Sequence, residues 1–165
     1  MRDYCIVVMG GAQARFFTLE PVEFPELESG PKLVERGKIT NPEKEIPGRD
    51  LYADPKAGRG RAPAGGPSHG YDDHRSQHED EFDRRFGRKV LEKARRIAKA
   101  NKARCVLLIA PSRMLGLIRQ EMDIISKQGM RVYELAKDMT KFTPRQIHDY
   151  LADEEWLPAC KRPGS

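Results

Sequence analysis

The residue types best suited to metal or proton-transfer chemistry lie close together between positions 69 and 78. Asp72, Asp73, His74 and His78 form the densest such group, and His69 lies three residues before Asp72. His74 and His78 are four residues apart, so they would share one face of a helix. A zinc site there needs a third protein ligand, for which His69 or Asp72 is nearest. The alternatives are a metal-free site used by a small hydrolase (His69, Asp72, Asp73, His74) and the start of a helix with two histidines beside its core stripe.

A dense block of cations follows this group. Residues 72–83 contain six acids and one arginine, whereas residues 84–104 contain ten cations and one acid, Glu92. The net charge is +5 and the isoelectric point is about 9.2, which is modestly basic. Such a block is typical of proteins that bind phosphates of RNA. The alternative is a solvated helix face whose cations complement the helix dipole. The candidate RNA-binding residues on this helix are Arg84, Arg88, Arg95 and Lys99, flanked by Arg85, Lys89 and Arg96.

A Gly/Pro-rich segment precedes the acidic group. Eleven of the thirty residues from Asn41 to Gly70 are glycine or proline. This composition predicts a long, flexible, exposed loop, and long loops in small domains are usually functional or disordered. Its cations could order on a phosphate backbone or simply keep the segment soluble. Among them are Arg49, Lys56, Arg59 and Arg61.

One further candidate site follows an apolar run. Ser112 and Arg113 come directly after Cys105–Ala110 and open a helix. Ligands of α/β sheets gather at such strand ends, and helix amides there bind anions, although a serine in this place is more often only a cap. The strands carry almost no acids, which argues against two-metal nuclease chemistry.

The length of 165 residues predicts a single domain over residues 1–165. Three short strands at the start form an antiparallel meander, and strands and helices alternate after the loop. A continuous apolar run is typical of a strand buried on both faces. We therefore predict an α/β fold with a mixed sheet and helices on its faces. The predicted strands are Tyr4–Met9, Ala12–Leu19, Lys32–Ile39, Cys105–Ala110 and Arg131–Leu135. One predicted helix starts at Asp72 or Asp73 and has a core stripe that includes Phe82, Phe86, Val90, Ala94 and Ile97. A second helix is predicted from Met114 to Ile125, and a third starts at a capping box formed by Thr143 and Gln146.

The cysteines and the first residues bear on the compartment. Cys5, Cys105 and Cys160 form no paired motif, and two of them lie inside apolar runs, as reduced core thiols do. The apolar run after Asp3 is too short for a secretory signal or a membrane span. We expect a cytoplasmic protein without a membrane span.

Several segments resemble a bacterial family of host attachment proteins, which are also grouped as relatives of the archaeal and eukaryotic peptide release factors. The similarity covers nearly the whole chain in order. The matching segments are Val7–Phe17, Asn41–Glu43, His69–Arg75, Ala110–Gly116 and Leu135–Pro144. The more distant likeness is to the middle domain of the eukaryotic release factor, a ribonuclease-H-like mixed sheet with helices on both faces.

This resemblance implies docking in the tRNA site of the ribosome. In release factors a Gly-Gly-Gln loop helps water to reach the peptidyl-tRNA ester. Gly65 and Gly66 match the two glycines, but Pro67 stands where the glutamine would be. Proline has neither an N–H nor an amide side chain, so that hydrolysis does not carry over.

The combined expectation is an RNA- or ribosome-binding, release-factor-like domain without this peptidyl-tRNA hydrolysis. The first alternative is a protein-interaction module involved in bacterial attachment to host cells, and the second is the small hydrolase named above. We favour a binding protein over an enzyme, and we expect no cofactor and no bound metal.

Overall fold

The computed structural model describes residues 4–42, 68–127 and 129–164, without the side chains of residues 68–79 and 124. One five-stranded sheet with the order β3-β2-β1-β4-β5 organises the fold. β2 runs antiparallel to β1 and β3, whereas β1, β4 and β5 are parallel neighbours. The predicted mixed-sheet α/β class is confirmed. The strands are β1 (Tyr4–Met9), β2 (Gln13–Glu20), β3 (Lys32–Thr40), β4 (Cys105–Ala110) and β5 (Arg131–Ala136).

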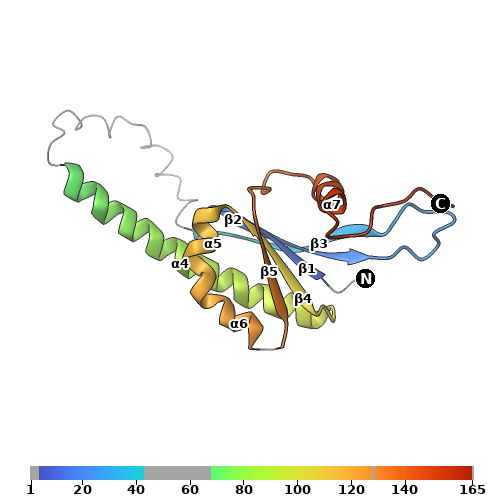
Figure 1. The fold of residues 1–165 in the computed structure, drawn as a ribbon, viewed down its shortest axis with the longest axis horizontal. Coiled ribbons are helices and arrows are strands. Elements are labelled where there is room, and N and C mark those ends of the chain that lie inside the picture. Colours follow the sequence, from blue (N-terminus) through green and yellow to red (C-terminus); the bar gives the residue numbers. More distant parts are fainter. Residues whose placement is uncertain (1–3, 43–67, 128, 165) are drawn as a thin grey trace.

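Helices cover both faces of this sheet (Figure 1). One face carries α4 (Ser68–Ala100), α5 (Ser112–Ile118), the 3-10 turn η2 (Arg119–Met122) and α6 (Asp123–Ser126). The other face carries α7 (Pro144–Asp153). Because β2 is the only reversed one among the five described strands, the carboxyl ends of β1, β3, β4 and β5 lie at the same end of the sheet.

The interior strands divide their side chains between two apolar cores. In β1, Cys5 and Val7 pack toward α4, whereas Ile6 and Val8 pack toward α7. β4 alternates in the same way, and Val106 through Ala110 are all fully buried. Burial on both faces explains why these strands read as continuous apolar runs instead of alternating ones.

The long helix begins earlier than its sequence pattern predicts. We predicted an N-cap at Asp72 or Asp73, but α4 begins at Ser68, so positions 68–70 of the predicted loop are helical. Positions 43–67 of that loop lie outside the described residues. The core stripe is confirmed at Phe86, which is 3% exposed. The stripe is also wider than predicted, because α4 packs on α5 as well as on the sheet.

The close contact between α4 and α5 depends on a glycine. A Cβ atom at Gly87 would come within 2.1 Å of Cγ2 of Ile118. Every heavier residue would therefore push the two helices apart. Gly87 interrupts the apolar periodicity of the sequence. Among the described glycines, it is the one at which an added Cβ atom would come closest to a neighbouring atom.

The prediction of a single helix from Met114 to Ile125 was wrong. The chain forms α5, then the 3-10 turn η2, then α6. The apolar residues of all three pieces still point into one core, at spacings of one to four residues. Such spacing does not distinguish one continuous helix from a broken one, so the apolar pattern does not reveal the break. The buried residues are Met114, Leu115, Ile118, Met122 and Ile125.

The start of α7 follows the predicted capping box. The backbone N–H of Gln146 donates to Oγ1 of Thr143 at 3.1 Å, and the backbone N–H of Thr143 donates to Oε1 of Gln146 at 2.8 Å. Pro144 occupies the first helical position, where no N–H is needed. Across the described residues, no helix is both long and apolar enough to cross a membrane.

Candidate functional site

A groove of about 650 Å³ runs between the end of β3 and the outer side of α4. Its floor is largely apolar and includes Ile39, Pro42 and Phe86. β3 is an edge strand, so no other strand of the described residues covers this side of α4. Residues of α4 that recur every three or four positions form the opposite wall. That wall consists of Arg85, Arg88, Lys89, Glu92, Lys93 and Arg96.

The wall of this groove carries five cations and a single carboxylate, that of Glu92. Two of the cations have partners elsewhere: Arg85 pairs with Glu81 at 3.3 Å, and Arg88 pairs with Glu121 at 3.1 Å. The Arg85 pair is well exposed on both sides and therefore weak. Within the described part of the chain, Lys89, Lys93 and Arg96 form no ion pair. The groove therefore has a surplus of positive charge that its own residues do not neutralise.

Lys93 reaches the groove across a glycine in β3. A Cβ atom at Gly37 would lie 2.9 Å from Cε of Lys93. The Lys93 ammonium lies 5.9 Å from the centre of the Phe16 ring, within cation–π range. Beside Gly37 the β2–β3 register shifts between Phe16 and Phe17. We did not predict Lys93 as a site residue, although a glycine inside a strand pattern is a known sign of a bulge or a close approach.

The predicted RNA-binding residues of α4 separate into two sides. Arg85, Arg88, Lys89 and Arg96 line the groove, whereas Arg84 and Arg95 do not. Successive helical residues are turned by roughly 100°, which places Arg84 and Arg95 on the flank nearer η2. Arg95 pairs with Glu92 at 3.3 Å. Lys99 lines a different hollow at the end of α4.

Other predicted site residues lie where their side chains are not described. His69, Asp72, Asp73, His74 and His78 fall in the first turns of α4. The loop residues Arg49, Lys56, Arg59, Arg61, Gly65 and Gly66 lie outside the described residues. Among the side chains that are described, no group of three or more His, Cys, Asp or Glu residues is placed to hold a metal ion. The metal and hydrolase hypotheses therefore remain predictions from the sequence.

A buried carboxylate, that of Asp83, connects several elements near the carboxyl end of the sheet. The side chain of Asp83 is 1% exposed and accepts a hydrogen bond from Nη1 of Arg113 at 2.8 Å. Nδ2 of Asn41 lies 3.5 Å from Asp83 and donates to the carbonyl of Gly11 at 2.9 Å. These contacts join α4, α5 and the first hairpin to the residue that follows β3. Asn41 and Pro42 also line a small hollow that adjoins the groove wall at Arg85 and Lys89.

Arg113 is held by carboxylates instead of being free for an anion. Its Nη2 atom donates to Oδ1 of Asp80 at 2.6 Å, in addition to the bond with Asp83. The hydrogen bond to Asp83 raises the pKa of Arg113, partial burial opposes that rise, and Asp80 adds to it. Ser112, which we predicted as a cap or anion ligand, is the first residue of α5, and Pro111 occupies the cap position without a side-chain bond.

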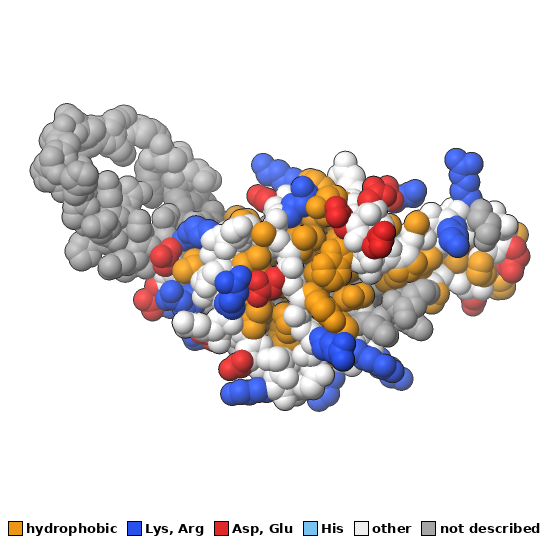
Figure 2. All heavy atoms as spheres, viewed as in Figure 1, with side chains coloured by type: hydrophobic (Ala, Val, Ile, Leu, Met, Phe, Trp, Pro, Cys, Tyr) orange, Lys and Arg blue, Asp and Glu red, His pale blue; other side chains and the backbone are white. Residues whose placement is uncertain are grey.

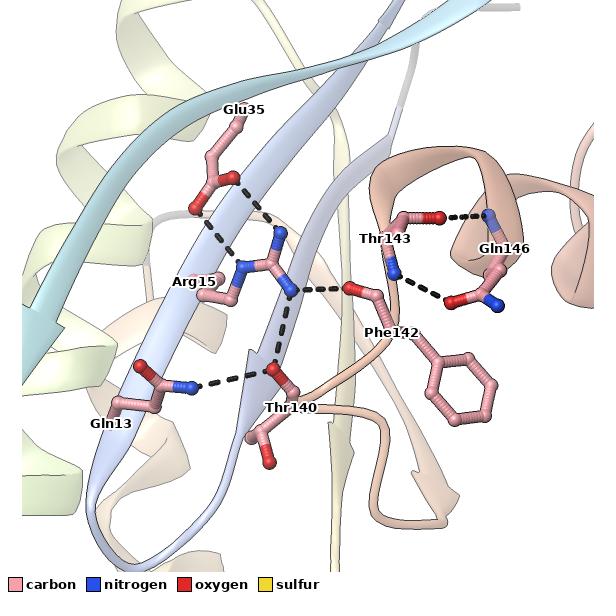
Figure 3. A network of polar contacts seen from close by, with 7 residues as sticks. All are labelled: Gln13, Arg15, Glu35, Thr140, Phe142, Thr143 and Gln146. Carbon is pink, nitrogen blue, oxygen red and sulfur yellow. Dashed lines mark hydrogen bonds and ion pairs between the residues drawn. The ribbon is translucent and has the colours of Figure 1, made fainter.

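A second polar network fixes the connection between β5 and α7 to the sheet (Figure 3). Arg15 in β2 donates to both carboxylate oxygens of Glu35 in β3, at 3.0 and 3.1 Å. It also donates to the carbonyls of Phe142, at 2.6 Å, and Thr140, at 3.3 Å. Gln13 supports the same Thr140 carbonyl at 3.3 Å. Because all these bonds are internal, Arg15 positions this end of the sheet and does not add charge to the groove.

Comparison with known proteins places the chain in a family. Residues 5–151 match the model of a family described as "Protein required for attachment to host cells". No curated protein matches the chain. The family match begins in β1 and ends in α7, so it spans both cores and every residue of the groove wall.

Proposed function

The chain belongs to the family of proteins required for attachment to host cells, and on that premise we propose that it is a release-factor-like domain that binds structured RNA or the ribosome. The phosphates of the RNA would lie along the groove between β3 and α4. The observation that carries this proposal is the charge of the groove wall, with five cations against one carboxylate.

The groove cations that form no described ion pair are better placed to bind a phosphate backbone than to bind one buried anion. Lys89 and Arg96 are exposed, and they project from α4 seven residues apart, which is about 10 Å along the helix axis. Cations that neutralise successive phosphates release counterions, and this release supplies most of the affinity of proteins that bind nucleic acid without reading its sequence. An arginine can in addition hold a phosphate through two parallel hydrogen bonds.

The apolar floor of the groove is suited to contact with the ribose and the base of a nucleotide. Ile39, Pro42 and Phe86 lie beneath the cations, where a ribose or the face of a base would be shielded from water. Release factors dock in the tRNA site of the ribosome, and the resemblance to them motivates the choice of RNA. Pro67 in place of the glutamine limits the proposal to binding, without the peptidyl-tRNA hydrolysis of that family.

Two double variants of α4 test this assignment. The groove variant is Lys89→Gln with Arg96→Gln, and the control is Arg84→Gln with Arg95→Gln. Both remove two charges from the same helix, and glutamine keeps the helix propensity. The control breaks only the weak Arg95–Glu92 pair. Binding is measured by fluorescence anisotropy with a labelled RNA hairpin and by co-sedimentation with ribosomes.

We expect the groove variant to bind RNA at least about tenfold more weakly at low salt, because two phosphate contacts are lost. The control should remain within about threefold of the wild type, the loss expected from net charge alone. Equal losses in the two variants would show that binding follows net charge and not the groove. A wild type without RNA or ribosome affinity at low salt would overturn the RNA proposal.

The second candidate is a protein-interaction module for attachment, which the family description favours. In that case the same cations would meet acidic side chains of a protein partner. The RNA experiment separates the two candidates, because an interaction module shows no affinity for the hairpin or the ribosome at low salt.

A further inference from the structure

A second basic hollow, of about 620 Å³, lies at the opposite end of the sheet from the Asp83 cluster. Four cations line it, and no carboxylate is among its described lining residues. Ala103, Cys105 and Met130 form its less polar wall. In Figure 2, Lys and Arg side chains gather at the lower edge of the molecule, where α4 ends and β4 and β5 begin. The four cations are Lys99, Lys102, Arg104 and Arg131.

The parallel pairing of β4 and β5 brings these cations together. Cys105 lies opposite Arg131 in the ladder, so the turn before β4 lies beside the turn before β5. The backbone N–H of Arg131 donates to the carbonyl of Arg104 at 3.1 Å. Lys99 and Lys102 come from the last turn of α4 and the residues directly after it. Two segments that are far apart in the sequence therefore supply one concentration of positive charge.

Lys102 occupies a backbone position that glycine normally takes. Its φ of 58° lies in the left-handed region, just after a helix, where a side chain adds strain. The backbone N–H groups of Lys102 and Ala103 close the helix end on Lys99 and Ala98. A glycine would cap the helix with less strain, but it would not place an ammonium group at the hollow.

These cations repel one another, and the described residues supply no ion pair to any of the four. A hydrogen bond with Tyr133 raises the pKa of the Arg131 guanidinium, so Arg131 stays a cation. A bound anion would relieve this repulsion. The volume lies within the usual range for sites of small ligands. We propose that this hollow binds the phosphate group of a small phosphorylated molecule, with the rest of that molecule against Ala103 and Met130.

This site is independent of the proposed RNA groove. Arg96, the last cation of the groove wall, does not line the hollow, and Lys99, the first cation of the hollow, does not line the groove. Failure of either proposal therefore leaves the other intact.

Cys105 provides a reporter inside the hollow. It is half-buried, and so is Cys160, which is not among the lining residues. The experiment measures the rate at which iodoacetamide alkylates each thiol, by mass spectrometry, during titration with inorganic pyrophosphate. We expect pyrophosphate to slow the alkylation of Cys105 at least about threefold and to leave Cys160 unchanged. Equal rates at Cys105 with and without saturating pyrophosphate would overturn the proposal. So would protection by an RNA hairpin but not by pyrophosphate, since the cations would then belong to an RNA surface.

A pair of glycine variants separates the ligand contact from backbone strain. Lys102→Gly removes the ammonium group and relieves the strained φ, so the fold should be retained. Glu155, with a φ of 66°, is the other described non-glycine residue with a positive φ, and Glu155→Gly is the matched control. We expect Lys102→Gly to weaken pyrophosphate binding about tenfold, as for a lost charged hydrogen bond, and Glu155→Gly to leave it unchanged. Unchanged binding in Lys102→Gly would remove Lys102 from the site and contradict the proposal.

Discussion

The contact between Asp83 and Arg113 predicts an asymmetry in stability. Asp83 is fully buried, with 1% of its side chain exposed, whereas 51% of the Arg113 side chain is exposed. Replacing Arg113 leaves a buried carboxylate whose described partner is Asn41, at the long distance of 3.5 Å. Replacing Asp83 leaves an arginine that reaches solvent and keeps Asp80 at 2.6 Å. The two halves of one ion pair should therefore differ in their cost of removal.

The magnitudes follow from what each change leaves behind. Removing the partner of a buried charge costs about 3–5 kcal/mol, and we expect Arg113→Met to fall near the lower end because Asn41 remains. Asp83→Asn keeps the volume and loses one charged hydrogen bond, which costs about 1.5–3 kcal/mol, again near the lower end because Arg113 stays solvated. Arg113→Met should thus destabilise the protein by about 1–2 kcal/mol more than Asp83→Asn.

Urea unfolding monitored by circular dichroism measures both costs. The slope of free energy against urea should stay constant, so that the shift in midpoint reports stability alone. The double variant should cost less than the sum of the single ones, because residues in contact are not additive. If Asp83→Asn costs as much as Arg113→Met or more, the buried carboxylate is not the group that needs its partner, and the reasoning fails.

Three further predictions concern the core. Burial raises the pKa of Cys5 to about 12, so its thiol should resist alkylation at pH 8 while Cys105 and Cys160 react. As the pH rises above 9.0, the thiol ionises in the unfolded chain before it ionises in the folded one, so the free energy of unfolding should fall. Cys5→Ala should reduce this loss of stability at high pH. Phe86→Ala should lower the free energy of unfolding by about 3–5 kcal/mol; a loss below about 1 kcal/mol in urea unfolding would show that Phe86 is not in the core. Gly87→Ala should cost about 1–3 kcal/mol because its Cβ would meet Ile118, and Ile118→Ala in the same chain should make the added methyl less costly if the clash is the cause.

Local patterns were sufficient to predict most of the framework. The antiparallel start, the buried strand at Cys105–Ala110 and the capping box at Thr143 depend on residues close in sequence, and all are confirmed. Phe86 also lies in the core as its helical spacing predicts. In each case the apolar period or the capping residues determine the structure without distant partners.

The incorrect predictions depend on distant contacts or on weak local signals. Asp72 and Asp73 resemble helix caps, but the helix continues through them to Ser68. The break after Ile118 leaves the apolar spacing intact, so periodicity does not reveal it. Both cases show that residue spacing identifies an element more reliably than its ends or its continuity.

The sequence indicated α4 as a candidate binding element from its cation block. It did not show which side of the helix faces the groove. Glu121 lies 33 residues from Arg88 and still pairs with it. Lys93 joins the groove only because Gly37 of β3 leaves room for its side chain. Such long-range pairings are properties of the folded chain.

The salt dependence of RNA binding tests the central proposal most directly. The logarithm of the association constant with an RNA hairpin is plotted against the logarithm of salt concentration for the wild type, the groove variant and the control. The proposal predicts a linear fall for the wild type and, for Lys89→Gln with Arg96→Gln, a slope smaller by up to about 2 units, while the Arg84→Gln with Arg95→Gln control keeps the wild-type slope. A groove variant with the wild-type slope, or a wild type that does not bind at low salt, would contradict it.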